Sequence, residues 1–191
     1  MKRWFVGVTL ASLAAFVIGL GVTKYRFQSS TAQYAAATFP KYYQSLEEIA
    51  RDAELVVLGE ARSNGTPFKY HDDLLYTSTP VRVLSVLKGQ DGPVPSDLQV
   101  VEEGGVWEAK DIQWWGTPRV GPGKRYLLFL QKPSMTDPPP NTYILVGAYM
   151  GKFEVSAGGQ LRYVGPAGEA KGLQEDASTT KLDDLEKRLQ R

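Results

Sequence analysis

The chain has 191 residues, a formal net charge of +1 and 42% hydrophobic residues, a composition typical of a folded domain. It has no cysteine, which excludes a disulfide framework, a thiol nucleophile and a cysteine-ligated metal. Its one histidine excludes a multi-histidine metal site within one chain. Residues 41–191 hold 18 basic and 21 acidic side chains, a net of −3, so we do not expect nucleic-acid binding.

The N-terminus carries an uncharged apolar run at residues 4–22, with basic residues on both sides. As a helix, this run is about 28 Å long, close to the hydrocarbon thickness of a bilayer. We therefore predict an N-terminal transmembrane anchor within residues 1–23, with the membrane as a partner and the rest of the chain extracytoplasmic in a single-pass topology. A cleaved secretory signal is the alternative, because residues 32–37 are rich in alanine, and the protein is then secreted. The anchor is favoured because the run is long and is followed by basic residues.

Residues 24–44 are predicted to form a tether, and a short helix follows it. Ser45 stands three residues before Glu48, the spacing of a capping box, and an apolar stripe begins directly afterwards. These signals predict a helix over residues 46–53 that packs against a sheet.

Seven short apolar segments then alternate with Gly/Pro turns, which is typical of an antiparallel barrel or sandwich. They predict strands at 54–61, 79–89, 98–102, 125–130, 142–146, 153–155 and 161–163. We expect a mainly β fold at residues 45–165, an antiparallel closed or partly open OB-like barrel with a short flanking helix. Residues 166–191 are predicted to be a loose segment, reaching about residue 178, and a C-terminal helix.

The order of these signals resembles a known group of proteins. A short helix runs into DAELVVLG (52–59), a strand ends in VLKG (86–89), Gly-Gly follows a strand (104–105), and GPGKRYLLFL closes the series (121–130). The pattern covers residues 45–155. It resembles small secreted or surface-attached bacterial proteins and, more distantly, netrin-like and metalloproteinase-inhibitor domains.

That resemblance implies a five-stranded OB-type barrel with a flanking helix. The eukaryotic inhibitors insert an N-terminal cysteine into the protease zinc site and depend on disulfides, and this chain has no cysteine. The resemblance therefore implies a barrel but supplies no functional residue.

Three tryptophans stand close together in a stretch flanked by glycine and proline, residues 106–118. Aromatic side chains in such a stretch provide large contact areas at a small entropic cost. Trp107, Trp114 and Trp115 are therefore the candidate ligand-binding residues. We expect Trp107 to belong to the core and the other two to be partly exposed in a loop.

A catalytic alternative involves His71, which is followed by two aspartates. A histidine beside carboxylates is suited to act as a general base for a serine such as Ser63 or Ser78. No G-x-S-x-G turn presents a serine, so a polar loop over residues 63–73 is the favoured interpretation and no catalytic residue is assigned.

A group of carboxylates, Glu102, Glu103, Glu108 and Asp111, offers oxygen ligands of the kind that Ca²⁺ takes. The D-x-[DN]-x-[DN]-G pattern of an EF-hand loop is absent. We therefore expect solvated carboxylates, with no metal and no cofactor.

Together these patterns favour a membrane-anchored, extracytoplasmic binding domain that recognises a protein, peptide or glycan through an aromatic loop. The alternatives are a serine-type hydrolase using His71 and a structural subunit of a cell-envelope complex that interacts through its transmembrane helix.

Overall fold

The computed structural model describes most of the chain from residue 41 onward and one short strand before it. The described residues are 33–35, 41–70, 74–89, 92–114, 116–166 and 168–190, with the backbone alone for 33–35 and 114. The run 4–22, predicted to span a membrane, lies outside them. Within the described ranges, no helix is both long enough and apolar enough to cross a membrane.

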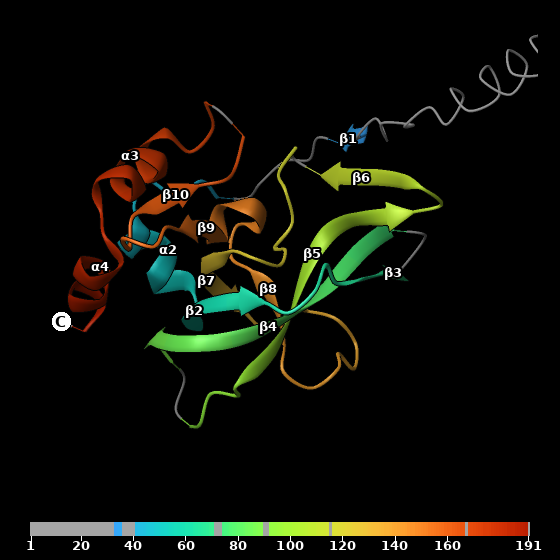
Figure 1. Cartoon of the computed structure of the whole chain (residues 1–191), viewed down its shortest axis with the longest axis horizontal. Helices are drawn as coiled ribbons and strands as arrows, with labels where there is room; N and C mark the ends of the chain where they lie inside the picture. Colours follow the sequence, from blue (N-terminus) through green and yellow to red (C-terminus); the bar gives the residue numbers. More distant parts are fainter. Residues whose placement is uncertain are drawn as a thin grey trace, which may run out of the picture. The chain divides into compact units, whose positions relative to one another are not determined.

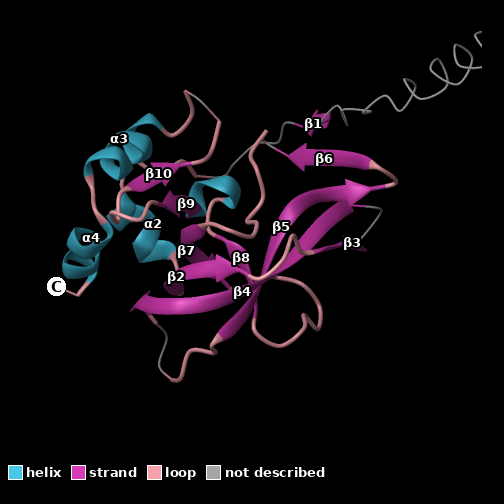
Figure 2. Cartoon of the chain, in the orientation of Figure 1, coloured by secondary structure: helices cyan, strands magenta, loops and turns pink. Residues whose placement is uncertain are grey.

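The described part of the chain is mainly β, as predicted (Figures 1 and 2). The strands are β1 (Gln33–Ala35), β2 (Leu55–Ala61), β3 (Thr66–Tyr70), β4 (Leu74–Lys88), β5 (Asp97–Trp107), β6 (Lys110–Trp114), β7 (Arg125–Gln131), β8 (Thr142–Leu145), β9 (Lys152–Val155) and β10 (Leu161–Tyr163). The helices are α2 (Leu46–Asp52), the 3-10 turn η1 (Ala148–Gly151), α3 (Lys171–Thr179) and α4 (Leu182–Leu189).

Five of these strands close into a barrel, which confirms that part of the prediction. β2 pairs with β4 and β7, β4 pairs with β5, and β8 joins β5 to β7. The barrel is not antiparallel throughout, because β5 and β8 run parallel with Gln99 opposite Thr142. A closed ring with an odd number of strands cannot reverse direction at every contact. One parallel pair is therefore a geometric requirement that the antiparallel prediction overlooked.

β2 and β7 are buried on both faces, which explains their uninterrupted apolar sequences. Leu55 and Val57 of β2 point into the barrel, whereas Val56 and Leu58 point outward toward the helices. We call the inward set the barrel-interior cluster; its buried members are Leu55, Val57, Ala61, Val81, Leu98, Val100, Val120, Tyr126, Leu128, Leu130, Tyr143 and Leu145.

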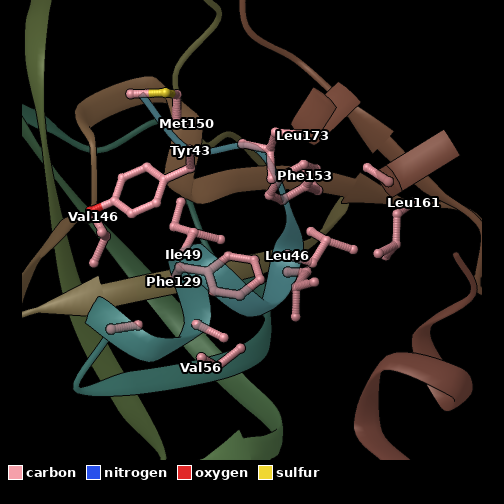
Figure 3. Packing of buried hydrophobic residues seen from close by; sticks show 14 of the residues in the cluster. Tyr43, Leu46, Ile49, Val56, Phe129, Val146, Met150, Phe153, Leu161 and Leu173 are labelled. Carbon is pink, nitrogen blue, oxygen red and sulfur yellow. The ribbon is translucent and has the colours of Figure 1, made fainter. Parts of the chain in front are cut away.

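A second cluster, the helix-side cluster, fills the space between the outer face of the barrel and the helices (Figure 3). Figure 3 labels ten of its members: Tyr43, Leu46, Ile49, Val56, Phe129, Val146, Met150, Phe153, Leu161 and Leu173. Within the cluster, the rings of Phe129 and Phe153 meet edge to face at 5.7 Å. The strands of the barrel wall thus contribute to two cores at once.

α2 confirms the helix predicted at 46–53, and both of its ends are capped. Ser45 Oγ accepts a hydrogen bond from the Glu48 amide at 3.2 Å. At the other end, Lys88 Nζ donates to the carbonyls of Ala50 at 2.8 Å and Ala53 at 2.6 Å. A cation at a helix C-terminus satisfies carbonyls that have no partner within the helix. β4 therefore holds α2 against the barrel.

Residues 171–179, predicted to be loose, instead form α3. Its Leu173 and Ala177 are fully buried in the helix-side cluster. The sequence carries no start signal for this helix, because it begins after Ala170 in a left-handed conformation (φ 48°) without a side-chain cap. α4 confirms the predicted C-terminal helix and buries Leu185 in the same cluster.

Two unpredicted strands continue the sheet beyond the barrel. β3 pairs with residues 74–78 at the start of β4, and β6 pairs with residues 104–107 at the end of β5. We call β3, β6, residues 74–78 and residues 103–107 the aromatic extension (Figure 1). β1 in turn pairs in parallel with β6. The predictions of a polar loop at 63–73 and an aromatic loop at 106–118 are thus wrong where these strands lie.

Candidate functional site

Three aromatic side chains gather on one face of the aromatic extension. Side chains alternate along a strand, so Phe68 and Tyr70 of β3 share a face, and the register sets Phe68 opposite Tyr76 of β4. The Phe68 and Tyr76 rings stack with centroids 5.9 Å apart, and Tyr70 meets Tyr76 edge-on at 6.4 Å. All three side chains are only half-buried. The result is a contiguous aromatic surface that solvent still reaches.

Apolar and acidic side chains border this surface. Leu74 lies opposite Tyr70 in the register and is 43% exposed, and Val106 of β5 is 55% exposed. Glu103 lies opposite Tyr76. Burial raises the pKa of the Tyr76 hydroxyl above its ordinary value of 10.0, and the negative charge of Glu103 raises it further. Tyr76 is therefore a neutral hydrogen-bonding group at the edge of an apolar patch.

The Pro-rich connection between β7 and β8 approaches the same surface. Tyr70 Oη accepts a hydrogen bond from the Thr136 amide at 3.1 Å. Residues 132–141 contain no helix or strand and are mostly exposed. The aromatic surface is thus bordered on one side by a surface loop that is tied to its outermost tyrosine.

Trp107 stands at the end of β5 and is half-buried, which corrects its expected place in the core. The ammonium of Lys69 lies over its indole ring, 5.2 Å from the centroid. Lys69 alternates with Phe68 and Tyr70 along β3, so this cation–π contact lies on the opposite face of the extension. Trp107 therefore does not join the three stacked rings.

A glycine pair allows β5 to pass close beneath β3 and β4. A Cβ on Gly105 would lie 2.7 Å from Thr77 Oγ1 and 3.1 Å from Pro67 Cβ. Gly104 has φ +90°, a conformation that L side chains rarely adopt. The Gly-Gly pair does not end the strand, as its sequence predicts, but is the point where β5 continues from the barrel into the extension.

The tryptophan-rich stretch is a hairpin rather than a loop. β5 ends at Trp107 and β6 begins at Lys110, with Glu108 and Ala109 between them at φ 49° and 61°. Two-residue hairpin turns with positive φ usually carry Asn-Gly or Asp-Gly, so Glu-Ala gave no turn signal. Trp114 is the last residue of β6. Its side chain and the whole of Trp115 lie outside what the structure describes, so their ligand-binding role stays a prediction.

Arg119 attaches the segment after β6 to that strand. Its guanidinium donates to Asp111 Oδ1 at 2.6 Å and to the Ile112 carbonyl at 3.1 Å, while Gln113 donates to Asp111 Oδ2 at 2.7 Å. Burial pushes the pKa of Asp111 upward, but the hydrogen bonds from Arg119 and Gln113 outweigh it, so the pKa falls below its ordinary value of 3.8. Asp111 is therefore an ionised structural group.

Glu102 is not a solvated carboxylate but one half of a buried ion pair. Its Oε1 lies 2.6 Å from Lys152 Nζ, with side-chain exposures of 6% and 1%. Glu102 Oε2 accepts from the Val120 amide at 2.7 Å, and Lys152 also donates to the Pro118 carbonyl at 2.5 Å. The sequence carries one signal for this pair, because Lys152 directly precedes the strand predicted at 153–155. The pair fixes the segment before β7 to β5 and β9.

The remaining candidate groups do not converge on a reactive centre. Ser78 donates to the Gln99 side-chain carbonyl at 3.0 Å, so its hydroxyl proton goes to a neutral amide rather than to a base. Ser63 Oγ accepts from the Gly65 amide. His71 lies outside the described residues. Across the part of the chain that the structure describes, no group of three or more His, Asp or Glu side chains is arranged to hold a metal ion.

Comparison with known proteins finds no family model, no curated protein and no solved structure that matches this chain. What the domain does has to be inferred from its own residues. Of the candidate sites among the described residues, the aromatic extension has the largest group of partly exposed rings.

Proposed function

We propose that this protein is a binding domain whose ligand, a protein, peptide or glycan, lies on the aromatic extension. The observation that carries the proposal is the set of contacting rings of Phe68, Tyr70 and Tyr76, which stay half exposed on two paired strands. Rings held by strands provide contact area with little further loss of entropy on binding. Exposed apolar surface that a domain keeps beside a polar rim is typical of interaction sites.

The strand order of the barrel supports an OB-type assignment. With β2, β4, β5, β7 and β8 counted as first to fifth, the ring order is first, second, third, fifth and fourth. In OB folds, ligands bind on the second and third strands between the first–second and fourth–fifth connections. The aromatic surface lies on β3 and β4, next to β5. The contact between Tyr70 and Thr136 joins the two corresponding connections.

We further propose that residues 4–22 anchor this domain in a membrane with residues 41–191 on the extracytoplasmic side. The uncharged length of the run and its basic flanks support the anchor. The orientation follows from the usual behaviour of single N-terminal spans, which most often place a following folded domain outside the cytoplasm. Two separate experiments test this proposal: carbonate extraction of isolated membranes tests the anchor, and protease digestion of intact cells tests the orientation. A chain that carbonate releases, or that protease does not reach, would contradict the anchor or its orientation.

Binding at the extension is tested with the full-length chain in non-ionic detergent. The chain is applied to an array of oligosaccharides and an array of twelve-residue peptides. Phe68→Ala is expected to weaken the retained interaction at least tenfold, because it removes a ring from the stack. A tenfold loss corresponds to about 1.4 kcal/mol of binding free energy. Trp107→Ala shows whether the opposite face contributes.

Tyr42→Ala is the matched control, because Tyr42 is an exposed aromatic (48%) outside the extension. It should bind like the wild type. The melting temperature of each variant separates lost binding from lost folding. If Phe68→Ala and Tyr42→Ala bind equally well while both remain folded, the aromatic surface is not the binding site.

A further inference from the structure

A second surface, formed by the start of β7 with β9 and β10, contains an open groove of about 680 Å³. The strands that form it lie together in Figure 1. Its wall includes three cationic side chains, Lys124, Arg125 and Arg162, and one carboxylate, Glu154. None of these residues belongs to the aromatic extension.

The carboxylate at the centre of the groove holds two of the three cations. Lys124 Nζ lies 2.5 Å from Glu154 Oε1, and Arg162 binds Oε2 of the same carboxylate. The pKa of Glu154 falls below its ordinary value of 4.5: burial opposes the fall, and the hydrogen bonds from Lys124 and Arg162 outweigh burial. Glu154 is therefore ionised at neutral pH, and it neutralises one of the cations.

The third cation of the groove is held by the backbone of the β9–β10 turn. Arg125 donates from one terminal nitrogen to the Ser156 carbonyl at 2.6 Å, and Glu60 of β2, outside the groove lining, lies opposite Arg125 in the register. The four ionic side chains that line the groove, three cations and one acid, carry a net charge of +2. Arg162 already lies opposite Glu154, so a cross-strand ion pair alone does not require Lys124 on the same carboxylate.

The cations keep hydrogen-bond donors that face solvent. Side-chain exposure is 52% for Lys124 and 65% for Arg162, whereas that of Glu154 is only 14%. An ammonium has three N–H donors and a guanidinium has five, and the contacts to Glu154 use a minority of them. Guanidinium groups match phosphate and carboxylate oxygens in pairs.

From this arrangement we infer that the groove is a binding site for a ligand carrying at least two oxyanion charges, as phosphate or carboxylate groups. The ligand neutralises the net charge of +2 and fills the space between the exposed cations and the Ser156 turn. Because the cations are exposed, the affinity decreases as the salt concentration rises.

Titration calorimetry of the full-length chain in non-ionic detergent tests this site with pyrophosphate and with citrate as probes. Experiments run at one low ionic strength. The two probes distinguish phosphate from carboxylate as the preferred group. We expect binding of at least one probe, weakened tenfold or more in the double variant Lys124→Gln/Arg162→Gln. Glu154→Gln is expected to tighten binding several-fold, because it frees both cations from their internal competitor.

The matched control is Arg51→Gln/Lys187→Gln, which removes the same charge from exposed positions on α2 and α4, outside the groove. It should bind like the wild type. Equal weakening in both double variants would show attraction to the net charge of the protein and would overturn the site. The absence of heat with both probes, or loss of binding in Glu154→Gln, would also overturn it.

Discussion

The helix-side cluster and the aromatic extension lie on different parts of one sheet and bury their apolar side chains to different extents. Around the cluster, β2 and β7 are covered by helices, and Leu46, Ile49 and Leu173 are fully buried. In the extension, β4 and β5 continue beyond the barrel, where helices no longer cover the sheet, and Phe68, Tyr70 and Tyr76 remain half exposed. Apolar side chains under the helices contribute to stability through complete burial, whereas those of the extension retain surface for another molecule.

The largest effect on stability is expected at the buried ion pair of Glu102 and Lys152. Lys152→Met leaves the Glu102 carboxylate buried without its cation, so we expect a loss of about 3–5 kcal/mol in the free energy of unfolding. The double variant Glu102→Gln/Lys152→Met should regain most of that loss, because no charge stays buried and the amide oxygen still accepts from Val120. Thermal unfolding followed by near-UV circular dichroism provides the comparison. A double variant no more stable than Lys152→Met would contradict this account.

Leu173→Ala tests how much the helix-side cluster contributes to stability. It removes a fully buried side chain from the helix-side cluster, and we expect it to cost roughly 3 kcal/mol. Ligand binding at the extension should be unchanged well below the melting temperature. Trp107→Ala should cost clearly less stability, because the ring is only half-buried. If Trp107→Ala destabilised the fold as much as Leu173→Ala, the extension would be part of the core.

The smallest effect on stability is expected at the Asp111–Arg119 ion pair, and this effect depends on pH. The pKa of Asp111 is lowered in the folded state, so its contribution is present above about pH 4 and is lost as the pH falls through the folded value, below 3.8. Arg119→Gln should therefore cost about 1 kcal/mol or less at pH 7, and less still at pH 2–3.

Melting temperatures of the wild type and Arg119→Gln between pH 7 and pH 2 measure this convergence. Lys187→Gln is the control, because its pair with Asp184 is exposed on both sides. A difference between Arg119→Gln and the wild type that stayed constant over this range would show that Arg119 acts through the Ile112 carbonyl alone.

Local patterns predicted most of the barrel. Buried runs such as Leu55–Ala61 and Arg125–Gln131 are recognisable as strands because their apolar stretches are short and continuous and are bounded by glycine or proline turns. The capping signal at Ser45 located α2 for the same local reason. These elements depend on information within a few neighbouring residues.

The aromatic extension, the buried ion pair and the groove depend on partners that are distant in the chain. β3 is a strand because β4 pairs with it, and Glu102 is buried because Lys152, fifty residues away, reaches it. Glu154 meets Lys124 across thirty residues.

The sequence by itself determined that the chain has an apolar N-terminal run, alternating strands and turns, and no cysteine chemistry. Only the tertiary structure decided which aromatic side chains stay exposed and which charges meet. Exposure and ion pairing depend on what packs against a residue, whereas the strand and helix signals that could be recognised lie within a few neighbouring residues.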